Sequence, residues 1–132
     1  MQTYVLMVQA DEDDRSLTES VLEEMQQEIP MHFISRINEL QNLVATSGLP
    51  AIILINNQDH RHKAIDMVKY LKGDASLSHI PVIVLGEITT PDYIKKYYRA
   101  GANSYITKPS TVAATKKKIQ LFLEYWFDVA EV

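Results

Sequence analysis

Short apolar runs alternate along this chain with segments whose apolar residues recur at helical spacing. The runs are rich in β-branched or aromatic residues, as β-strands are. Five strands are predicted, at Tyr4–Val8, His32–Ile34, Ala51–Ile55, Val82–Leu85 and Ser104–Ile106. The third and fourth runs are apolar throughout, which is typical of central parallel strands buried on both faces. The pattern therefore predicts a parallel sheet.

Five helices are predicted between and after these strands. Their apolar residues share the spacing of one buried helix face. The sets are Leu17, Val21, Leu22 and Met25; Ile37, Leu40 and Val44; Ala64, Met67, Val68 and Leu71; Ile94 and Tyr97; and Ile119, Phe122, Leu123 and Trp126. Glycines end the second, third and fourth helices, and Thr90 and Pro91 supply an N-cap and a first-turn proline to the fourth. The result is an α/β chain of five strand–helix units.

Composition limits the classes of function. A chain of 132 residues with 46% hydrophobic and 23% charged residues suits one globular domain, expected over residues 1–132 with no output domain. The lack of cysteine excludes disulfides, thiolate zinc sites and cysteine nucleophiles. The net charge is -4 and the one basic run, Lys116–Lys118, is interpreted as a solvated helix face, so nucleic acid is not an expected partner.

The start of the chain and its apolar runs bear on location. Residues Met1–Val8 lack the basic leader of a signal peptide, and no apolar run has the length of a membrane span. A cytoplasmic location without membrane contact is therefore expected. In a doubly wound sheet, ligands bind at the carboxyl ends of the strands. The segments expected there are Gln9–Asp14, Asn56–Lys63, Gly86–Thr89 and Thr107–Lys108.

Four segments of the chain resemble response-regulator receiver domains of two-component signalling. They are Tyr4–Val8 with Asp11–Arg15, Leu49–Asn56, His79–Leu85 and Gly101–Pro109, and their order and spacing fit from about Thr3 to the last helix. The resemblance implies a flavodoxin-like fold, with a five-stranded parallel sheet in the order 2-1-3-4-5 and five helices. It also implies a signalling module and not an enzyme.

The residues that carry receiver chemistry are missing from the matching positions. In the family, two acidic residues after the first strand and an aspartate at the end of the third hold Mg²⁺, and that aspartate accepts a phosphoryl group. The matching positions here are Gln9, Ala10 and Asn56. Mg²⁺ requires hard oxygen ligands, usually with one or two carboxylates. An amide at position 56 is not a carboxylate nucleophile, so the resemblance implies an atypical receiver without a phosphoacceptor, metal or cofactor.

Three further positions matter by the same resemblance. Gly86 stands where receivers usually place the Ser or Thr that binds the phosphoryl group, so a hydroxyl is lost as well. Lys108 matches the lysine that pairs with the aspartate and then with the phosphoryl group; here we expect it to bind the Asn56 side-chain oxygen or to reach solvent. Tyr105 matches the aromatic residue that turns inward or outward with activation. A ring buried toward Gly86 would indicate an active-like arrangement.

Several other polar residues near these positions have simpler interpretations. The carboxylates of Asp11–Asp14 suit the first turn of a helix through its dipole and cap, and only Asp11 remains a candidate metal ligand. Asp59 is set aside as a substitute phosphoacceptor because it lies in a polar loop beyond the strand. His60 and His62 are interpreted as solvated, because two histidines without a third strong ligand seldom form a metal site.

The candidate interaction face lies on the last two helices and the last strand. Ile94, Tyr97 and Gly101 are assigned to the inner face of the fourth helix, and surface aromatics and cations are assigned to the outside. The candidate residues are Tyr93, Lys95, Lys96, Tyr98, Tyr125 and Phe127. The expected partner is a protein: a histidine kinase, another signalling protein, or a second copy in a homodimer through the fourth helix, fifth strand and fifth helix.

The leading hypothesis is a stand-alone receiver-like protein that acts in a phosphorelay by protein contacts, without phosphorylation. One alternative is a receiver that still responds to Mg²⁺ and a phosphodonor through a carboxylate such as Asp11. A more remote one is a flavodoxin-like carrier or enzyme. That function would need backbone donors for an anion in the loop after the first strand, where this chain has four carboxylates that repel phosphate.

Overall fold

The computed structural model describes residues 3–25, 29–57 and 63–129. The chain forms two compact units, residues 1–10 with 30–107 and residues 11–29 with 108–132. The first unit contains the sheet and three α-helices, and the second contains two α-helices. The single domain expected over residues 1–132 stays a prediction.

The first unit is built on five parallel strands. They are β1 (Val5–Val8), β2 (Met31–Ile34), β3 (Ile52–Asn56), β4 (Val82–Gly86) and β5 (Ser104–Thr107). Their order in the sheet is β2-β1-β3-β4-β5, and every neighbouring pair is parallel. The predicted flavodoxin-like fold and strand order are confirmed.

The register places the polar strand ends at one edge of the sheet. Asn56 pairs with Leu85, and Gly86 pairs with Thr107. The strands β3 and β4 each extend one residue beyond the predicted apolar run, so Asn56 and Gly86 are the last residues of their strands. Because the strands are parallel, all these positions lie at the carboxyl edge.

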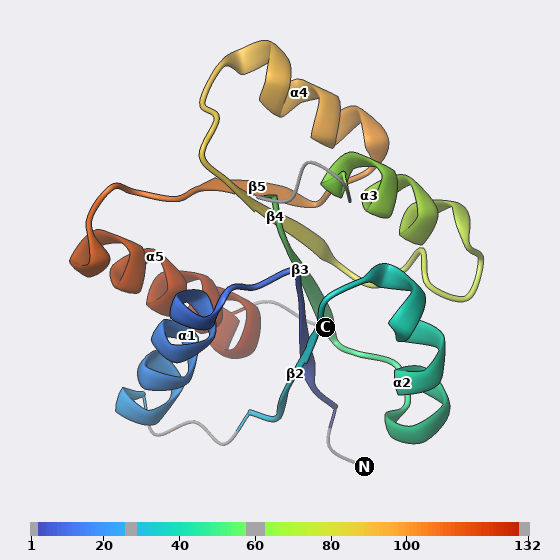
Figure 1. Ribbon diagram of the computed structural model, residues 1–132, viewed down its shortest axis with the longest axis horizontal. Coiled ribbons are helices and arrows are strands. Elements are labelled where there is room, and N and C mark those ends of the chain that lie inside the picture. Colours follow the sequence, from blue (N-terminus) through green and yellow to red (C-terminus); the bar gives the residue numbers. More distant parts are fainter. Residues whose placement is uncertain (1–2, 26–28, 58–62, 130–132) are drawn as a thin grey trace. The chain divides into compact units, whose positions relative to one another are not determined.

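Three α-helices of the first unit lie on one face of the sheet (Figure 1). They are α2 (Leu40–Ser47), preceded by the 3₁₀ turn η1 (Ile37–Glu39), α3 (Ala64–Gly73) and α4 (Pro91–Ala100). Alternate strand residues and the apolar helix positions form one buried cluster, including Leu6, Val8, Ile53, Ile55, Val84, Met67, Leu71, Tyr97 and Tyr105. All residues of β1, β3 and β4 are buried, which confirms the burial predicted for the third and fourth apolar runs.

The ends of α4 follow the sequence signals with one exception. Pro91 occupies the first turn, and Gly101 ends the helix in the left-handed region with φ 110°. The Gly101 N–H caps the last turn through the carbonyls of Tyr97 and Tyr98. Thr90 holds the N-cap position as predicted, although its side chain makes no capping hydrogen bond.

The second unit contains α1 (Glu12–Glu24) and α5 (Val112–Glu124), which contact each other. The Asp11 carboxylate accepts a hydrogen bond from the Asp14 N–H, and the Thr111 hydroxyl accepts one from the Ala114 N–H, so both helices begin with a side-chain cap. The last predicted helix is divided, because residues Tyr125–Val129 form the π-helical segment η2. Among the described residues, no helix is both long and apolar enough to cross a bilayer.

Candidate functional site

Gln9 and Asn56 brace the ends of β1 and β3 by a reciprocal pair of hydrogen bonds. The Gln9 Nε2 group donates to the Asn56 carbonyl over 3.3 Å, and the Asn56 Nδ2 group donates to the Gln9 carbonyl over 3.1 Å. Gln9 Nε2 also lies 3.8 Å from the sulfur of Met67. Asn56 is 1% exposed, so its side chain belongs to the interior. The two amides therefore link neighbouring strands at the carboxyl edge.

The backbone of Gln9 has an unusual conformation. Its φ is 62°, which places a non-glycine residue in the left-handed region, while its N–H donates to the Ile34 carbonyl over 3.0 Å. For a residue with a Cβ, adopting this left-handed conformation costs about 1 kcal/mol of free energy. The reciprocal amide bonds help to offset that cost. This conformation could not be predicted from the residue type, because glutamine is not a typical residue for a positive φ.

The donor chemistry at these strand ends does not fit Mg²⁺. The matching positions carry two amides and the methyl group of Ala10, and the amide nitrogens point at backbone carbonyl oxygens. Mg²⁺ requires near-octahedral oxygen ligands, usually including a carboxylate. Among the described residues of the chain, no three His, Cys, Asp or Glu side chains gather as a metal-binding group. Gln9 and Asn56 thus form a structural brace, and Ala10 supplies no ligand.

Tyr105 of β5 is turned toward Gly86. The residue is 8% exposed, and its hydroxyl donates to the Ile88 carbonyl over 3.1 Å. A Cβ added to Gly86 would overlap the Tyr105 hydroxyl and lie 2.7 Å from its Cζ atom. The ring thus occupies the space that a larger residue at position 86 would need. Burial raises the pKa of Tyr105, so the hydroxyl remains a proton donor at neutral pH.

The second unit places Lys108 against Asp14. Lys108 Nζ lies 2.8 Å from Asp14 Oδ1 and 2.9 Å from Oδ2, and the two side chains are 11% and 10% exposed. The expectation that Lys108 reaches solvent is therefore wrong. Asp14 was interpreted only as a first-turn carboxylate, and 94 residues separate it from Lys108. No local pattern connects positions so far apart.

Burial raises the pKa of the Asp14 carboxyl, although hydrogen bonding and attraction from Lys108 oppose this shift. The nearby carboxylate of Asp11 raises the pKa of Asp14 further. Asp11 itself caps α1, with 2.7 Å from its Oδ1 to the Asp14 N–H. One of its oxygens is therefore already used as a helix cap.

The candidate interaction residues are divided between the two units. On α4 of the first unit, Lys95 and Lys96 are exposed and Tyr98 is 47% exposed. In the second unit Tyr125 is exposed and Phe127 is half-buried. The Tyr98 hydroxyl accepts a hydrogen bond from the Tyr105 N–H of the edge strand β5 over 3.1 Å.

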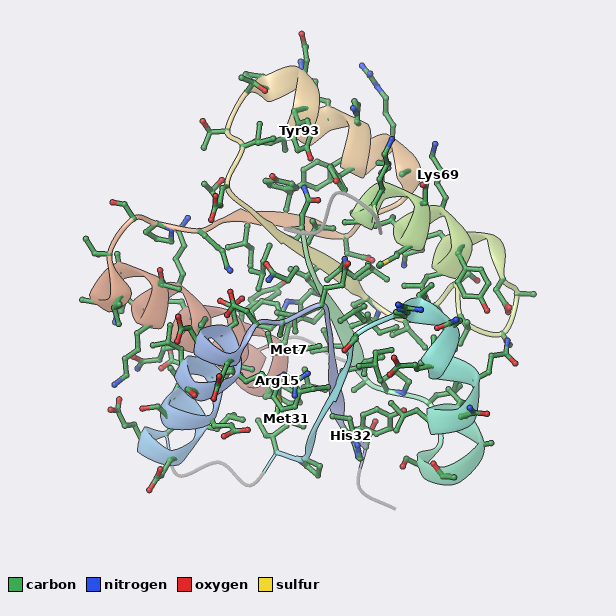
Figure 2. The ribbon with its side chains drawn as sticks, viewed as in Figure 1. Met7, Arg15, Met31, His32, Lys69 and Tyr93 are labelled. Atoms are coloured by element: carbon green, nitrogen blue, oxygen red, sulfur yellow. The ribbon has the colours of Figure 1, made fainter. Side chains whose placement is uncertain are left out.

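Tyr93 lies only partly at the surface to which it was assigned. The side chain is half-buried and packs against the core cluster (Figure 2). Its hydroxyl accepts a hydrogen bond from Asn57 Nδ2 over 2.7 Å and lies 3.3 Å from the Tyr97 hydroxyl. Residues four apart share a helix face, so the buried position of Tyr97 was the signal for Tyr93. Asn57 belongs to the segment Asn56–Lys63 expected at this edge, but no role was predicted for it.

Asp59, His60 and His62, in the loop after β3, lie outside the described residues. The interpretation of the two histidines as solvated stays a prediction, and so does the exclusion of Asp59 as a phosphoacceptor.

Comparison with curated proteins finds chemotaxis and cell-differentiation regulators. The chain is 34% identical over 62 residues to chemotaxis protein CheY-3 of Vibrio cholerae, covering 47% of this chain and 48% of that protein. It is 30% identical over 74 residues to the polar-differentiation response regulator DivK of Brucella ovis, covering 56% and 60%. The chain thus spans about half the length of the curated relatives it matches. No family model matches the chain.

Solved structures match over nearly the whole chain. The phosphorylated cyanobacterial phytochrome response regulator RcpA superposes with a TM-score of 0.86 at 20% identity, covering 99% of this chain and 98% of that one. A response-regulator receiver domain from Rhodospirillum rubrum gives a TM-score of 0.85 at 21% identity, covering 98% and 96%. The chain has the fold of these receivers and resembles response regulators in sequence.

Proposed function

We propose that this chain is a receiver-like module of two-component signalling that acts through protein contacts, without aspartyl phosphorylation. The observation that carries the proposal is the amide brace between Gln9 and Asn56, where a phosphoryl-accepting site needs carboxylates. An amide forms no acyl phosphate, so the scaffold is left with binding as its function. The role is non-enzymatic and cytoplasmic in this proposal, and the 132 residues act as one domain.

Phosphodonor treatment tests the first part of the proposal. We expect the purified chain to gain no phosphoryl group when incubated with acetyl phosphate and Mg²⁺, as read by intact mass. A matched variant, Gln9→Asp, Ala10→Asp and Asn56→Asp together, restores the three carboxylates and is expected to gain one group. A stable mass increase on an aspartate of the unmodified chain, Asp11 included, would overturn the proposal.

The inward ring of Tyr105 supports a fixed, active-like arrangement. In receivers an inward aromatic residue goes with the activated form, and here the ring is buried beside Gly86 in a chain with an amide at position 56. No hydroxyl at position 86 competes for that space. We therefore propose that the module presents one arrangement of α4 and β5 to its partner constitutively.

The outer side of α4 is the surface that we propose for the partner. Lys95, Lys96 and Tyr98 are exposed there, and the Tyr98 ring is held by its hydrogen bond to β5. An aromatic ring fixed in place loses little conformational entropy on binding, as the anchors of interfaces require. The partner is a protein, either a histidine kinase, another signalling protein or a second copy of this chain.

Charge reversal on α4 tests this surface. We expect Lys95→Glu with Lys96→Glu to weaken association with the partner, or self-association, by at least about tenfold. The new carboxylates would repel the negative charges that complement the two lysines. Affinity capture from the native cell and the oligomeric state by light scattering measure the change. Lys63→Glu, at the exposed start of α3, is the control. Unchanged partners and oligomeric state in the α4 variant would show that the surface is wrongly chosen.

A further inference from the structure

Asn57, the first residue after β3, contacts a helix 36 positions away in the chain. Its Nδ2 group donates to the Tyr93 hydroxyl over 2.7 Å, a short bond between half-buried side chains. The Asn57 N–H is bonded to the Leu85 carbonyl over 2.8 Å, so the backbone that carries the amide is itself held by β4. Tyr93 lies in the first turns of α4, beside Pro91. The bond therefore connects the carboxyl end of the sheet to the start of α4.

Tyr93 is also part of a cluster of three tyrosines, two from α4 and one from β5. Its ring centroid lies 6.4 Å from that of Tyr105 at an interplanar angle of 84°, an edge-to-face contact. It lies 5.5 Å from the centroid of Tyr97, which in turn lies 5.3 Å from that of Tyr105. Such ring pairs favour defined geometries. Fixing Tyr93 consequently fixes one wall of the space in which the Tyr105 ring lies.

The outward path of Tyr105 is limited from two sides. Its hydroxyl is held by the Ile88 carbonyl in the segment that joins β4 to α4, and its own N–H is bonded to the Tyr98 hydroxyl. Both contacts depend on where α4 and the segment before it lie. Movement of the start of α4 would therefore release the ring as well as the Asn57 bond.

We propose that the Asn57–Tyr93 hydrogen bond holds α4 in place and keeps Tyr105 inward. A contact within the chain would then stabilise the arrangement that the phosphoryl group stabilises in receivers that are phosphorylated. The inference rests on the proposed function and adds the means by which it is maintained. Space beside Gly86 permits the inward ring, and the Asn57–Tyr93 bond makes that arrangement the stable one. Asn57 is a positioning residue in this account.

Two single variants remove the bond from opposite ends. Asn57→Leu keeps a side chain of similar size without a donor, and Tyr93→Phe keeps the ring without the hydroxyl. We expect each to raise amide hydrogen exchange across α4 by about tenfold, as the loss of one good hydrogen bond does. We also expect each to produce a second, solvent-exposed Tyr105 signal in spectra of ¹³C-labelled tyrosine rings.

The double variant separates this bond from general damage. If the two residues act through their shared bond, the double variant raises exchange by less than the product of the two single effects, whereas independent effects multiply. The two effects need not be equal, because the Tyr93 hydroxyl also contacts that of Tyr97. Tyr93→Phe removes a single oxygen, so it tests the inference even where Asn57→Leu does not fold. An unchanged Tyr105 signal and unchanged α4 exchange in folded Tyr93→Phe would overturn the inference. The phosphodonor experiment is independent of it: failure there removes the proposed function and leaves the bond standing.

Discussion

Replacing Gly86 with threonine is expected to push the ring of Tyr105 out of the core. The new Cβ would overlap the Tyr105 hydroxyl and lie 2.7 Å from Cζ, a distance that real Cβ atoms do not show. Gly86 has no positive φ, so the backbone accepts a side chain and the ring has to move. Loss of a buried aromatic ring with its hydrogen bond is expected to cost about 2–4 kcal/mol of unfolding free energy.

Urea unfolding and labelled-tyrosine spectra measure this effect. Gly73→Thr is the matched control for the change of residue type, because nothing lies within 4 Å of an added Cβ at the end of α3. In the double variant Gly86→Thr with Tyr105→Ala, the threonine is expected to cost little beyond the loss of the ring. A Gly86→Thr protein with wild-type stability and a buried Tyr105 would contradict the prediction.

The strand pattern was sufficient to predict the sheet, because its information is local. Five short apolar runs, two of them apolar throughout, indicate parallel strands with both faces buried, and the structure has those strands in the expected order. The predicted strands and helices differ from the observed ones at their ends. Polar Asn56 extends β3, and Trp126 lies in a π-helical segment after α5, because hydrogen bonding at element ends does not follow hydrophobic periodicity.

The contacts of the candidate site could be predicted only in part. The absence of carboxylates from positions 9, 10 and 56 follows from residue identity alone. What replaces them does not: the amide brace depends on the register of β1 and β3 and on the positive φ of Gln9. Similarly, the side chain of Asn57 bonds to a tyrosine 36 positions later. Such pairings depend on the tertiary structure, and the spacing of residues in one sequence does not show which distant residues meet.

Lys108→Met is expected to lower the free energy of unfolding by about 2–3 kcal/mol. Lys108 and Asp14 are 11% and 10% exposed, and removing one partner of a largely buried pair leaves a charge that is poorly solvated. The attraction that lowers the pKa of Asp14 is lost with the lysine, so this pKa is expected to rise further above its ordinary value. Chemical denaturation gives the stability, and carboxyl ¹³C titration gives the pKa.

The expected pH dependence follows from the direction of that shift. A carboxyl whose pKa is higher in the folded than in the unfolded state binds its proton more tightly when folded, so between the two pKa values stability falls as pH rises. Lys108→Met raises the folded-state pKa of Asp14 and so widens this pH range. The loss of unfolding free energy in Lys108→Met, relative to the unmodified chain, is expected to be largest at neutral pH and to shrink in acid. Comparing the two proteins at acid and neutral pH measures the cost of the buried Asp14 charge, because protonated Asp14 is neutral and no longer needs a cation.

Two further variants distinguish a buried ion pair from simple loss of a side chain. Asp14→Leu with Lys108→Met removes both charges, and it is expected to recover most of the lost stability, since a buried pair often contributes little more than apolar residues of similar volume. Lys116→Met breaks the more exposed pair with Glu24, which is expected to matter by less than about 1 kcal/mol. If Lys108→Met cost no more than Lys116→Met, or the double variant were the least stable of the set, the lysine would be acting through its packing and not through the carboxylate of Asp14.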